Sequence, residues 1–302
     1  ILCAFFGTFL ALKYLSSMLP KDAGREFAHD GKKSAGKPRG AGLIFILAFG
    51  IVAMLFGKLN WEILIYLVLT IASMLTGYLD DASKNPWGEF KKGALDLLIA
   101  CLVAGTYLAF NGSEIFINIL GESIVLNPIV FFILAVILVW VSINVTNCTD
   151  GVDGLSGTLS VITLFTIYLL ESVKGTNSAI NYITLILIVC VLAYLWFNAT
   201  PSKLMMGDAG SRALGIFISI AILKTGSPLL YIPVALMLII DGGLGLIKIS
   251  FRRFLKIEIL NNIRTPIHDQ VRKRNDWSNT QVVFRFAIIQ IIISFCVIYL
   301  IK

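Results

Sequence analysis

The sequence predicts an all-α, polytopic integral membrane protein with about ten transmembrane helices and an active site at the cytoplasmic face. Three observations support this prediction: a mean hydropathy of +0.86, a chain that is 57% hydrophobic and 14% charged, and basic residues gathered in alternate gaps between apolar runs. A soluble protein with this composition would expose large apolar patches. The chain therefore belongs in a bilayer.

Ten apolar runs are long enough to cross the hydrocarbon core as helices. They cover about residues 1–19, 42–57, 61–79, 93–110, 128–146, 154–172, 180–198, 211–226, 228–249 and 282–301. The sequence begins at Ile1 inside the first run, so we expect that run to be cut short. Because no internal repeat or separate soluble region interrupts the pattern, residues 1–302 are predicted to form a single transmembrane domain.

The segments between these runs form two alternating sets that differ in charge. One set comprises about residues 20–41, 80–92, 147–153, 199–210 and 250–281, and with the adjoining span ends it carries 20 of the 25 Lys and Arg residues. Since basic loops are retained in the cytoplasm, this set is placed there and both termini outside. The same bias explains the net charge of +7 without a nucleic-acid partner.

Two connecting segments have patterns of their own. Residues 111–127 alternate apolar and polar side chains, which predicts a short external hairpin. The stretch Ile249–Ile263 is apolar and basic, which predicts an amphipathic helix lying at the membrane interface.

Polar clusters interrupt the apolar chain on the predicted cytoplasmic side. Asp80 and Asp81 end the third run, Asp208 precedes the eighth, and His268 follows Pro266 in the last loop. Carboxylates are costly at the edge of the hydrocarbon, so their gathering at one face indicates a polar site that holds a metal ion. The alternatives are a helix end capped by acids for the aspartate pair and a solvated loop position for the histidine.

A further cluster places Asn144, Asn147, Asp150 and Asp153 three residues apart. This spacing aligns the four side chains on one face if the segment is helical. Neighbouring glycines, including Gly151, would let a ligand or another segment approach closely. A simple Asp-Gly turn would account for only one of the four polar positions.

The expected metal is Mg²⁺, because carboxylate and phosphate oxygens satisfy its preference without a full protein cage. Asp208 lies at a predicted helix N-terminus, where backbone N–H groups can also bind a pyrophosphate. Adjacent helical residues point about 100° apart. Asp80 and Asp81 are therefore expected to have different partners, one the metal and the other a phosphate, a lysine or solvent. The five cysteines lack the spacing of a zinc site or a disulfide framework.

Taken in this order, the clusters resemble the polyprenyl-phosphate N-acetylhexosamine-1-phosphate transferase family from about residue 32 to 286. The resemblance implies a ten-span enzyme that uses Mg²⁺ to transfer a phospho-sugar from a UDP-sugar to undecaprenyl phosphate. It assigns catalytic roles to Asp80, Asp81, Asp208 and His268, with Asp208 as the metal ligand. It assigns substrate binding to Lys32, Asn144, Asn147, Asp150, Gly151, Asp153, Leu155, Asn198 and Met205.

The chain departs from the family pattern in three places. The family's triple histidine reads His268-Asp269-Gln270, and Met205 stands where an aromatic residue often stacks on uracil. The segment Lys37–Gly42 is closer to relatives that use UDP-N-acetylglucosamine. Against this, Trp277 and Arg285-Phe286 resemble the branch that uses UDP-N-acetylmuramoyl-pentapeptide.

The branch resemblance implies synthesis of lipid I and UMP for peptidoglycan in a bacterial plasma membrane, with the active site facing the cytoplasm. Its expected partners are UDP-N-acetylmuramoyl-pentapeptide, undecaprenyl phosphate and the lipid bilayer, and a homodimer remains open. One alternative is a transferase that loads N-acetylglucosamine-1-phosphate onto undecaprenyl phosphate. Another is a secondary transporter, which would place its acids near the bilayer midplane within an inverted repeat.

Overall fold

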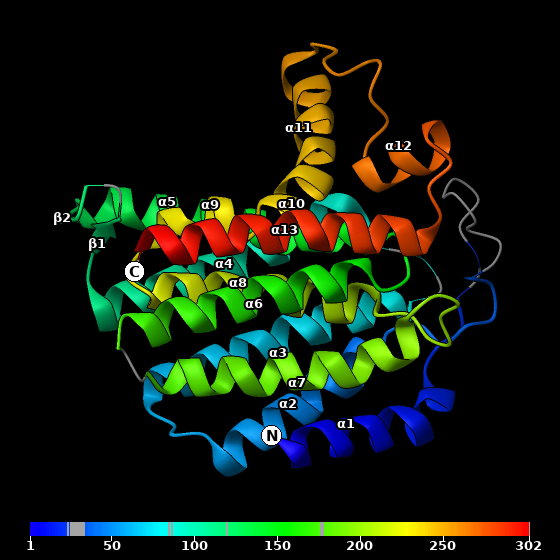
Figure 1. Cartoon of the computed structure of the whole chain (residues 1–302), viewed down its shortest axis with the longest axis horizontal. Helices are drawn as coiled ribbons and strands as arrows, with labels where there is room; N and C mark the ends of the chain where they lie inside the picture. Colours follow the sequence, from blue (N-terminus) through cyan, green and yellow to red (C-terminus); the bar gives the residue numbers. More distant parts are fainter. Residues whose placement is uncertain are drawn as a thin grey trace.

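A computed structural model describes residues 1–22, 24, 34–83, 85, 87–118, 120–175 and 178–301. The chain folds into a bundle of helices with one two-stranded sheet (Figure 1). The helices are α1 (Leu2–Leu15), α2 (Gly42–Phe56), α3 (Trp61–Asp81), α4 (Glu89–Asn111), α5 (Pro128–Thr149), α6 (Leu155–Val173), α7 (Ala179–Asn198), α8 (Gly207–Lys224), α9 (Tyr231–Val234), α10 (Leu236–Leu238), α11 (Leu244–Ser250), α12 (Ile267–Arg274) and α13 (Asn279–Ile301). The strands are β1 (Glu114–Ile117) and β2 (Glu122–Val125).

The prediction of a helical, polytopic membrane protein is confirmed. Within the described ranges, six helices are long and apolar enough to cross a membrane, namely α3, α4, α5, α6, α7 and α13. The segments Pro228–Val234 and Leu236–Leu255 meet at a 70° bend and would add a seventh span if they count as one. α1 and α2 are shorter apolar helices, and α8 carries Asp208, Arg212 and Lys224. The count of ten spans therefore stays a prediction.

Helix α8 is the centre of the bundle, because every residue from Gly207 to Leu223 is buried. Glycines bring its neighbours unusually close. A Cβ on Gly77 of α3 would lie 2.4 Å from the Asp208 carbonyl oxygen, and one on Gly215 would lie 2.5 Å from the Ser142 carbonyl oxygen of α5. Small residues at helix crossings favour such tight packing. This packing holds the end of α3 beside the start of α8.

A short turn separates α5 from α6. α5 stops at Thr149, and Gly154 adopts a left-handed backbone with φ of 84° at the start of α6. Only glycine takes this conformation without strain. Asn144 and Asn147 are therefore helical, whereas Asp150 and Asp153 lie in the following turn. The expected single helical face for all four residues does not form, because the helix ends at Thr149, before Asp150 and Asp153.

Two other local predictions can be compared with the structure. The predicted hairpin is present as β1 and β2, which pair antiparallel with Glu114 opposite Val125. The predicted amphipathic helix over Ile249–Ile263 is helical only to Leu255, because Lys256 takes a left-handed backbone and ends it. Figure 1 shows α11 projecting away from the bundle.

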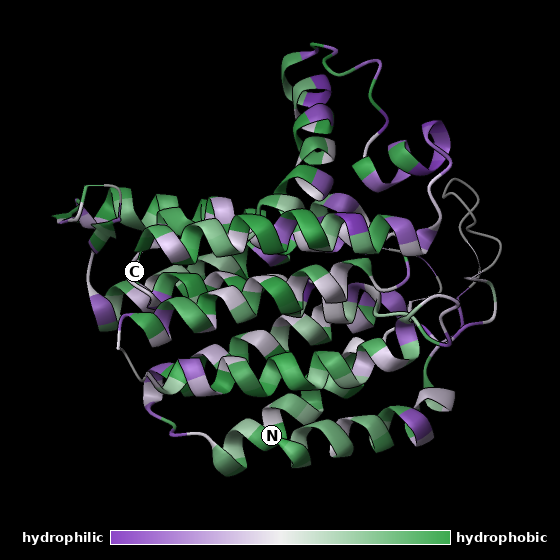
Figure 2. Ribbon diagram, viewed as in Figure 1, coloured by the Kyte–Doolittle hydropathy of each residue, from purple (hydrophilic) through white to green (hydrophobic). Residues whose placement is uncertain are grey.

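Hydrophobic residues follow the middle of the bundle helices, and hydrophilic residues gather around α12 and the loops at the end of the bundle near it (Figure 2). That end carries the loop from 199 to 206 and the start of α13, opposite the β hairpin (Figure 1). The polar loops are therefore concentrated at one end of the bundle.

Candidate active site

A cavity of about 830 Å³ is built from all five segments that were predicted to be cytoplasmic loops or their adjoining helix ends. One lining residue from each is Arg39, Lys92, Asp150, Met205 and His268. These residues are far apart in the sequence and converge only through the fold. The segments that carry the polar clusters therefore meet at one cavity, although Asp80 and Asp81 are not among its lining residues.

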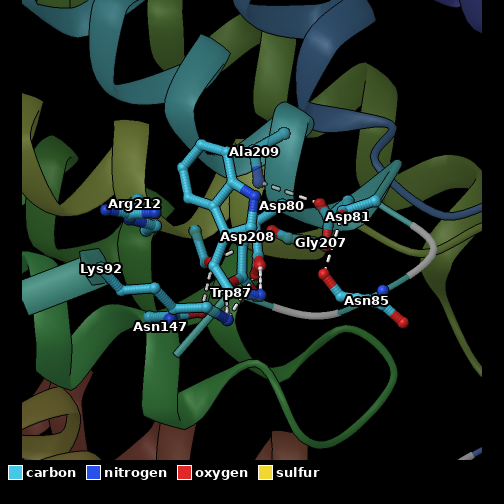
Figure 3. A network of polar contacts seen from close by, with 12 residues as sticks. Asp80, Asp81, Asn85, Trp87, Lys92, Asn147, Gly207, Asp208, Ala209 and Arg212 are labelled. Atoms are coloured by element: carbon cyan, nitrogen blue, oxygen red, sulfur yellow. Dashed lines mark hydrogen bonds and ion pairs between the residues drawn. The ribbon is translucent and has the colours of Figure 1, made fainter. Parts of the chain in front are cut away.

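Asp80 and Asp81 end α3 and turn to different partners, as expected for adjacent helical residues (Figure 3). Asp80 forms an ion pair with Lys92 and accepts a hydrogen bond from the Trp87 backbone N–H at 2.7 Å. One carboxylate oxygen of Asp81 lies 2.9 Å from Arg39 Nε, and the other accepts from the Ala209 N–H at 3.2 Å. Each acid therefore holds one cation of the cavity wall.

Asp208, in the first turn of α8, lies between the same two cations. Its carboxylate oxygens are 3.3 Å from Lys92 Nζ and 3.6 Å from Arg39 Nη2. Burial disfavours the charged guanidinium, but Asp81 and Asp208 outweigh this and raise the pKa of Arg39 above its ordinary value. The result is a compact network of three carboxylates and two cations at the cavity wall.

The donor atoms of this network fit a metal ion that is shared with a substrate. No cluster of three or more His, Cys, Asp or Glu side chains suited to a metal occurs in the part of the chain that is described. Asp208 does present a carboxylate to the cavity. Mg²⁺ is commonly held by one or two carboxylates together with substrate phosphates and water. Asp208 is the residue that would hold it in that mode.

The end of α5 and the turn after it form another wall of the cavity, with Asn147, Asp150, Gly151 and Asp153 among its lining residues. Asn147 Oδ1 accepts a hydrogen bond from Ser211 Oγ at 2.8 Å. Asp153 accepts from the Ser202 N–H at 3.2 Å. The wall is thereby joined to α8 and to the loop after α7.

Three predicted binding residues, Asn144, Leu155 and Asn198, contact other parts of the protein. Asn144 donates to the Trp140 carbonyl oxygen at 2.8 Å and does not line the cavity. Leu155 is completely buried in the hydrophobic core and does not line it either. Asn198 lines the cavity and joins two loops, because it accepts from the Gly154 N–H at 2.8 Å and donates to the Leu204 carbonyl oxygen at 2.9 Å.

Met205 lies in the loop after α7, beside the segment that carries Arg39. Met205 lines the cavity, and its backbone N–H donates to the Pro38 carbonyl oxygen at 2.8 Å. This bond pairs the loop after α7 with the segment that carries Arg39. Lys32 lies outside the described residues.

His268 is not in a solvated loop, because it lies in α12 with only 2% of its surface exposed. Its ring contacts Gly151 so closely that a Cβ there would lie 2.3 Å from Nε2. The two residues that replace the family's other histidines have local roles. Asp269 accepts from Arg272 at 2.6 Å, and Gln270 accepts from the Arg264 N–H at 2.8 Å.

Several charged residues of the structure were not predicted as site residues. Arg39 and Lys92 counted only as basic loop charges, although they contact all three aspartates of the network. Asp96 and Arg212 form a buried ion pair, and Asp241 is fully buried beside His268. The last three lie within predicted spans, where an ionisable residue is itself a signal of function or pairing.

Sequence comparison gives consistent matches. The sequence profile of the family described as "Glycosyl transferase family 4" matches residues 63–226. A phospho-N-acetylmuramoyl-pentapeptide-transferase of Treponema pallidum is 37% identical, over 95% of this chain and 84% of its own. Proteins of the same name from Dictyoglomus thermophilum and Wolbachia pipientis are 29% and 26% identical, over 96% and 85% of this chain and 93% and 82% of their own.

Proposed function

Because this chain belongs to glycosyl transferase family 4, among relatives named phospho-N-acetylmuramoyl-pentapeptide-transferase, we propose that it catalyses the reaction of that name. It transfers phospho-N-acetylmuramoyl-pentapeptide from the UDP-sugar to undecaprenyl phosphate, which forms lipid I and UMP for peptidoglycan. The observation that carries the proposal is the cavity wall in which Arg39 and Lys92 are held among Asp80, Asp81 and Asp208.

The reaction is an in-line attack by an oxygen of the lipid phosphate on the β-phosphorus of the UDP-sugar, with UMP as the leaving group. Phosphoryl transfer depends mainly on positioning and charge stabilisation. Lys37, Arg39, Lys92 and Arg272 line the cavity and supply positive charge for the phosphates. Asp208 would hold Mg²⁺, which would supply charge stabilisation for the departing UMP.

Asp80 and Asp81 orient cations rather than accept a proton in this scheme. A phosphate monoester already exposes anionic oxygens at neutral pH, because its second pKa is about 6. The dianion therefore needs no general base, whereas the monoanion must still give its proton to a group other than these two aspartates. Both oxygens of Asp81 are engaged, one by Arg39 and one by the Ala209 N–H, so they are poorly placed to attack phosphorus. We accordingly propose a single displacement rather than an aspartyl-phosphate intermediate.

His268→Ala should lower kcat at least about tenfold, because His268 lines the cavity and a positioned histidine that exchanges a proton typically contributes about 10² to 10⁴ in rate. The measurement is steady-state UMP release by detergent-purified protein. Lys273→Ala is the matched control, since Lys273 is an exposed residue of the same helix that does not line the cavity. If His268→Ala keeps normal kinetics, the histidine has no part in the reaction.

We also propose that the cavity faces the cytoplasm of a bacterial plasma membrane, where a UDP-sugar would reach it. Support comes from the basic charge of the loops that build it. A cysteine at Ser278 should resist a membrane-impermeant thiol reagent in intact cells, and one at Ser123 of the β hairpin should react. Both positions are exposed. The native cysteines must first be replaced, because Cys148 lines the cavity. Reversed labelling would contradict the orientation.

The donor is tested by supplying UDP-N-acetylmuramoyl-pentapeptide or UDP-N-acetylglucosamine, each with and without undecaprenyl phosphate. We expect UMP only with the pentapeptide donor and only when the lipid phosphate is present. Release of UMP from UDP-N-acetylglucosamine but not from the pentapeptide donor would identify the other transferase activity. The Pro38-Arg39-Gly40 sequence favours that alternative. Absence of UMP with either donor would contradict the proposed function altogether.

A further inference from the structure

Asp241 is a fully buried acid in a π-helical turn, Ile239–Gly243, within the bent segment that follows α8. A buried carboxylate is costly unless its oxygens are hydrogen-bonded. Both oxygens of Asp241 are directed at one residue, His268. Oδ1 accepts from the His268 backbone N–H at 2.7 Å, and Oδ2 lies 2.8 Å from the ring Nδ1. Both oxygens of the acid therefore contact the same histidine, which lies 27 residues later in the chain.

The turn that carries Asp241 packs directly against α5. A Cβ on Gly242 would lie 2.3 Å from the Val145 carbonyl oxygen, so the two backbones are in direct contact. The end of the same helix leads into Gly151, which contacts the other side of the histidine ring at Nε2. The ring is therefore confined between a carboxylate at Nδ1 and the cavity-lining turn at Nε2.

The surroundings of Nε2 leave it as the nitrogen available to the cavity. Among the ion pairs of the described residues, its acidic neighbour is Asp269, whose Oδ1 lies 3.9 Å away. That oxygen already accepts from Arg272 Nη2 at 2.6 Å. Nδ1, in contrast, lies 2.8 Å from the Asp241 carboxylate oxygen Oδ2. The two nitrogens of the ring are therefore not equivalent.

We propose that Asp241 is a positioning residue that fixes neutral His268 as the tautomer with the proton on Nδ1 and so presents an unprotonated Nε2 to the cavity. A hydrogen bond at one ring nitrogen sets the state of the other in this way. Nε2 is then the atom that exchanges a proton with a phosphate or water in the cavity. This catalytic consequence rests on the proposed function, whereas the tautomer does not.

The tautomer can be measured directly because the chain has only two histidines, His29 and His268. His29→Gln leaves one imidazole, whose ¹⁵N chemical shifts in detergent-solubilised protein identify the protonated nitrogen once the pH is high enough for a neutral ring. We expect the proton on Nδ1. In the Asp241→Asn variant we expect a shift toward the Nε2–H form, because the amide can donate to Nδ1.

Asp269→Asn is the matched control, since Asp269 is the other acid near the ring. It should leave the tautomer unchanged. A proton on Nε2 in the His29→Gln protein would overturn the proposal, and this result requires no Asp241 variant to fold. The spectrum also decides the proposal if the protein releases no UMP, so its failure is distinct from failure of the proposed function.

A double-mutant cycle tests the catalytic consequence. Asp241→Asn should lower kcat at least about tenfold, a smaller loss than the roughly 10²- to 10⁴-fold typical when acid-base catalysis is removed outright. In a protein that already carries His268→Ala, the same change should cause little further loss, because its effect acts through the histidine. Equal losses in both backgrounds would assign Asp241 a general structural role and overturn the positioning role.

Discussion

Asp208→Asn is expected to reduce kcat/KM at least about a hundredfold while the protein stays folded. The change removes a negative charge from the wall where Lys92 and Arg39 converge, and it removes the carboxylate proposed to hold Mg²⁺. Loss of a single group that stabilises charge in a transition state commonly has an effect of about 10² to 10³ in rate. The measurement is UMP release over a Mg²⁺ titration.

The Mg²⁺ dependence and a control variant identify the cause of the loss. Raising Mg²⁺ should restore part of the activity if the variant chiefly binds the metal more weakly. Glu89→Gln, which removes an exposed acid paired only with Arg253 among the ion pairs described, should behave as the unchanged protein. Near-normal turnover by Asp208→Asn at low Mg²⁺ would remove this aspartate from the site.

The second large effect concerns stability. Arg212 of α8 and Asp96 of α4 form an ion pair in which both residues are at most 3% exposed. Arg212→Met leaves Asp96 as a buried carboxylate without its cation. Breaking a buried pair in this way typically destabilises a protein by about 3 to 5 kcal/mol. A marked drop in the thermal unfolding midpoint of detergent-purified protein is therefore expected.

The double variant Asp96→Leu with Arg212→Met is the informative control. It removes both charges, so it should recover most of the stability lost in the single variant. Arg253→Met, which breaks an exposed pair with Glu89, should change the free energy of unfolding by no more than about 1 kcal/mol. A double variant as unstable as the single one would show that packing, rather than the unpaired acid, governs this contact.

The same pair connects stability to the site. Asp96 lies one turn beyond Lys92 on α4, and Arg212 lies one turn beyond Asp208 on α8. Two cross-links, one at the cavity and one behind it, therefore join the same two helices. We infer that loss of the inner pair will also weaken the contact between Lys92 and Asp208.

Local sequence predicted the helical class and the polar loops well. The length of an apolar run and the number of basic residues in a loop can be read from local sequence alone. Asp80, Asp81 and Asp208 could therefore be assigned to one face before any contact was known. The β hairpin was likewise encoded by local alternation. These properties need no knowledge of which helix packs against which.

The sequence was less informative where contacts between distant segments decide the structure. α5 ends at Thr149, so the regular spacing of Asn144, Asn147, Asp150 and Asp153 gave the wrong geometry. His268 looked like a loop residue because its partner, Asp241, lies in another helix. Only the fold brings that buried acid to His268, and Arg39 and Lys92 to the cavity.

The identity of the nucleotide product tests the central claim most directly. The claim is attack at the β-phosphorus, so the phosphate next to the sugar must travel with it to the lipid. With a UDP-N-acetylmuramoyl-pentapeptide donor labelled at the β-phosphate, we expect the label in the lipid product and UMP as the released nucleotide. Release of UDP, or label that stays with the nucleotide, would mean that the sugar moves without its phosphate and would contradict the account.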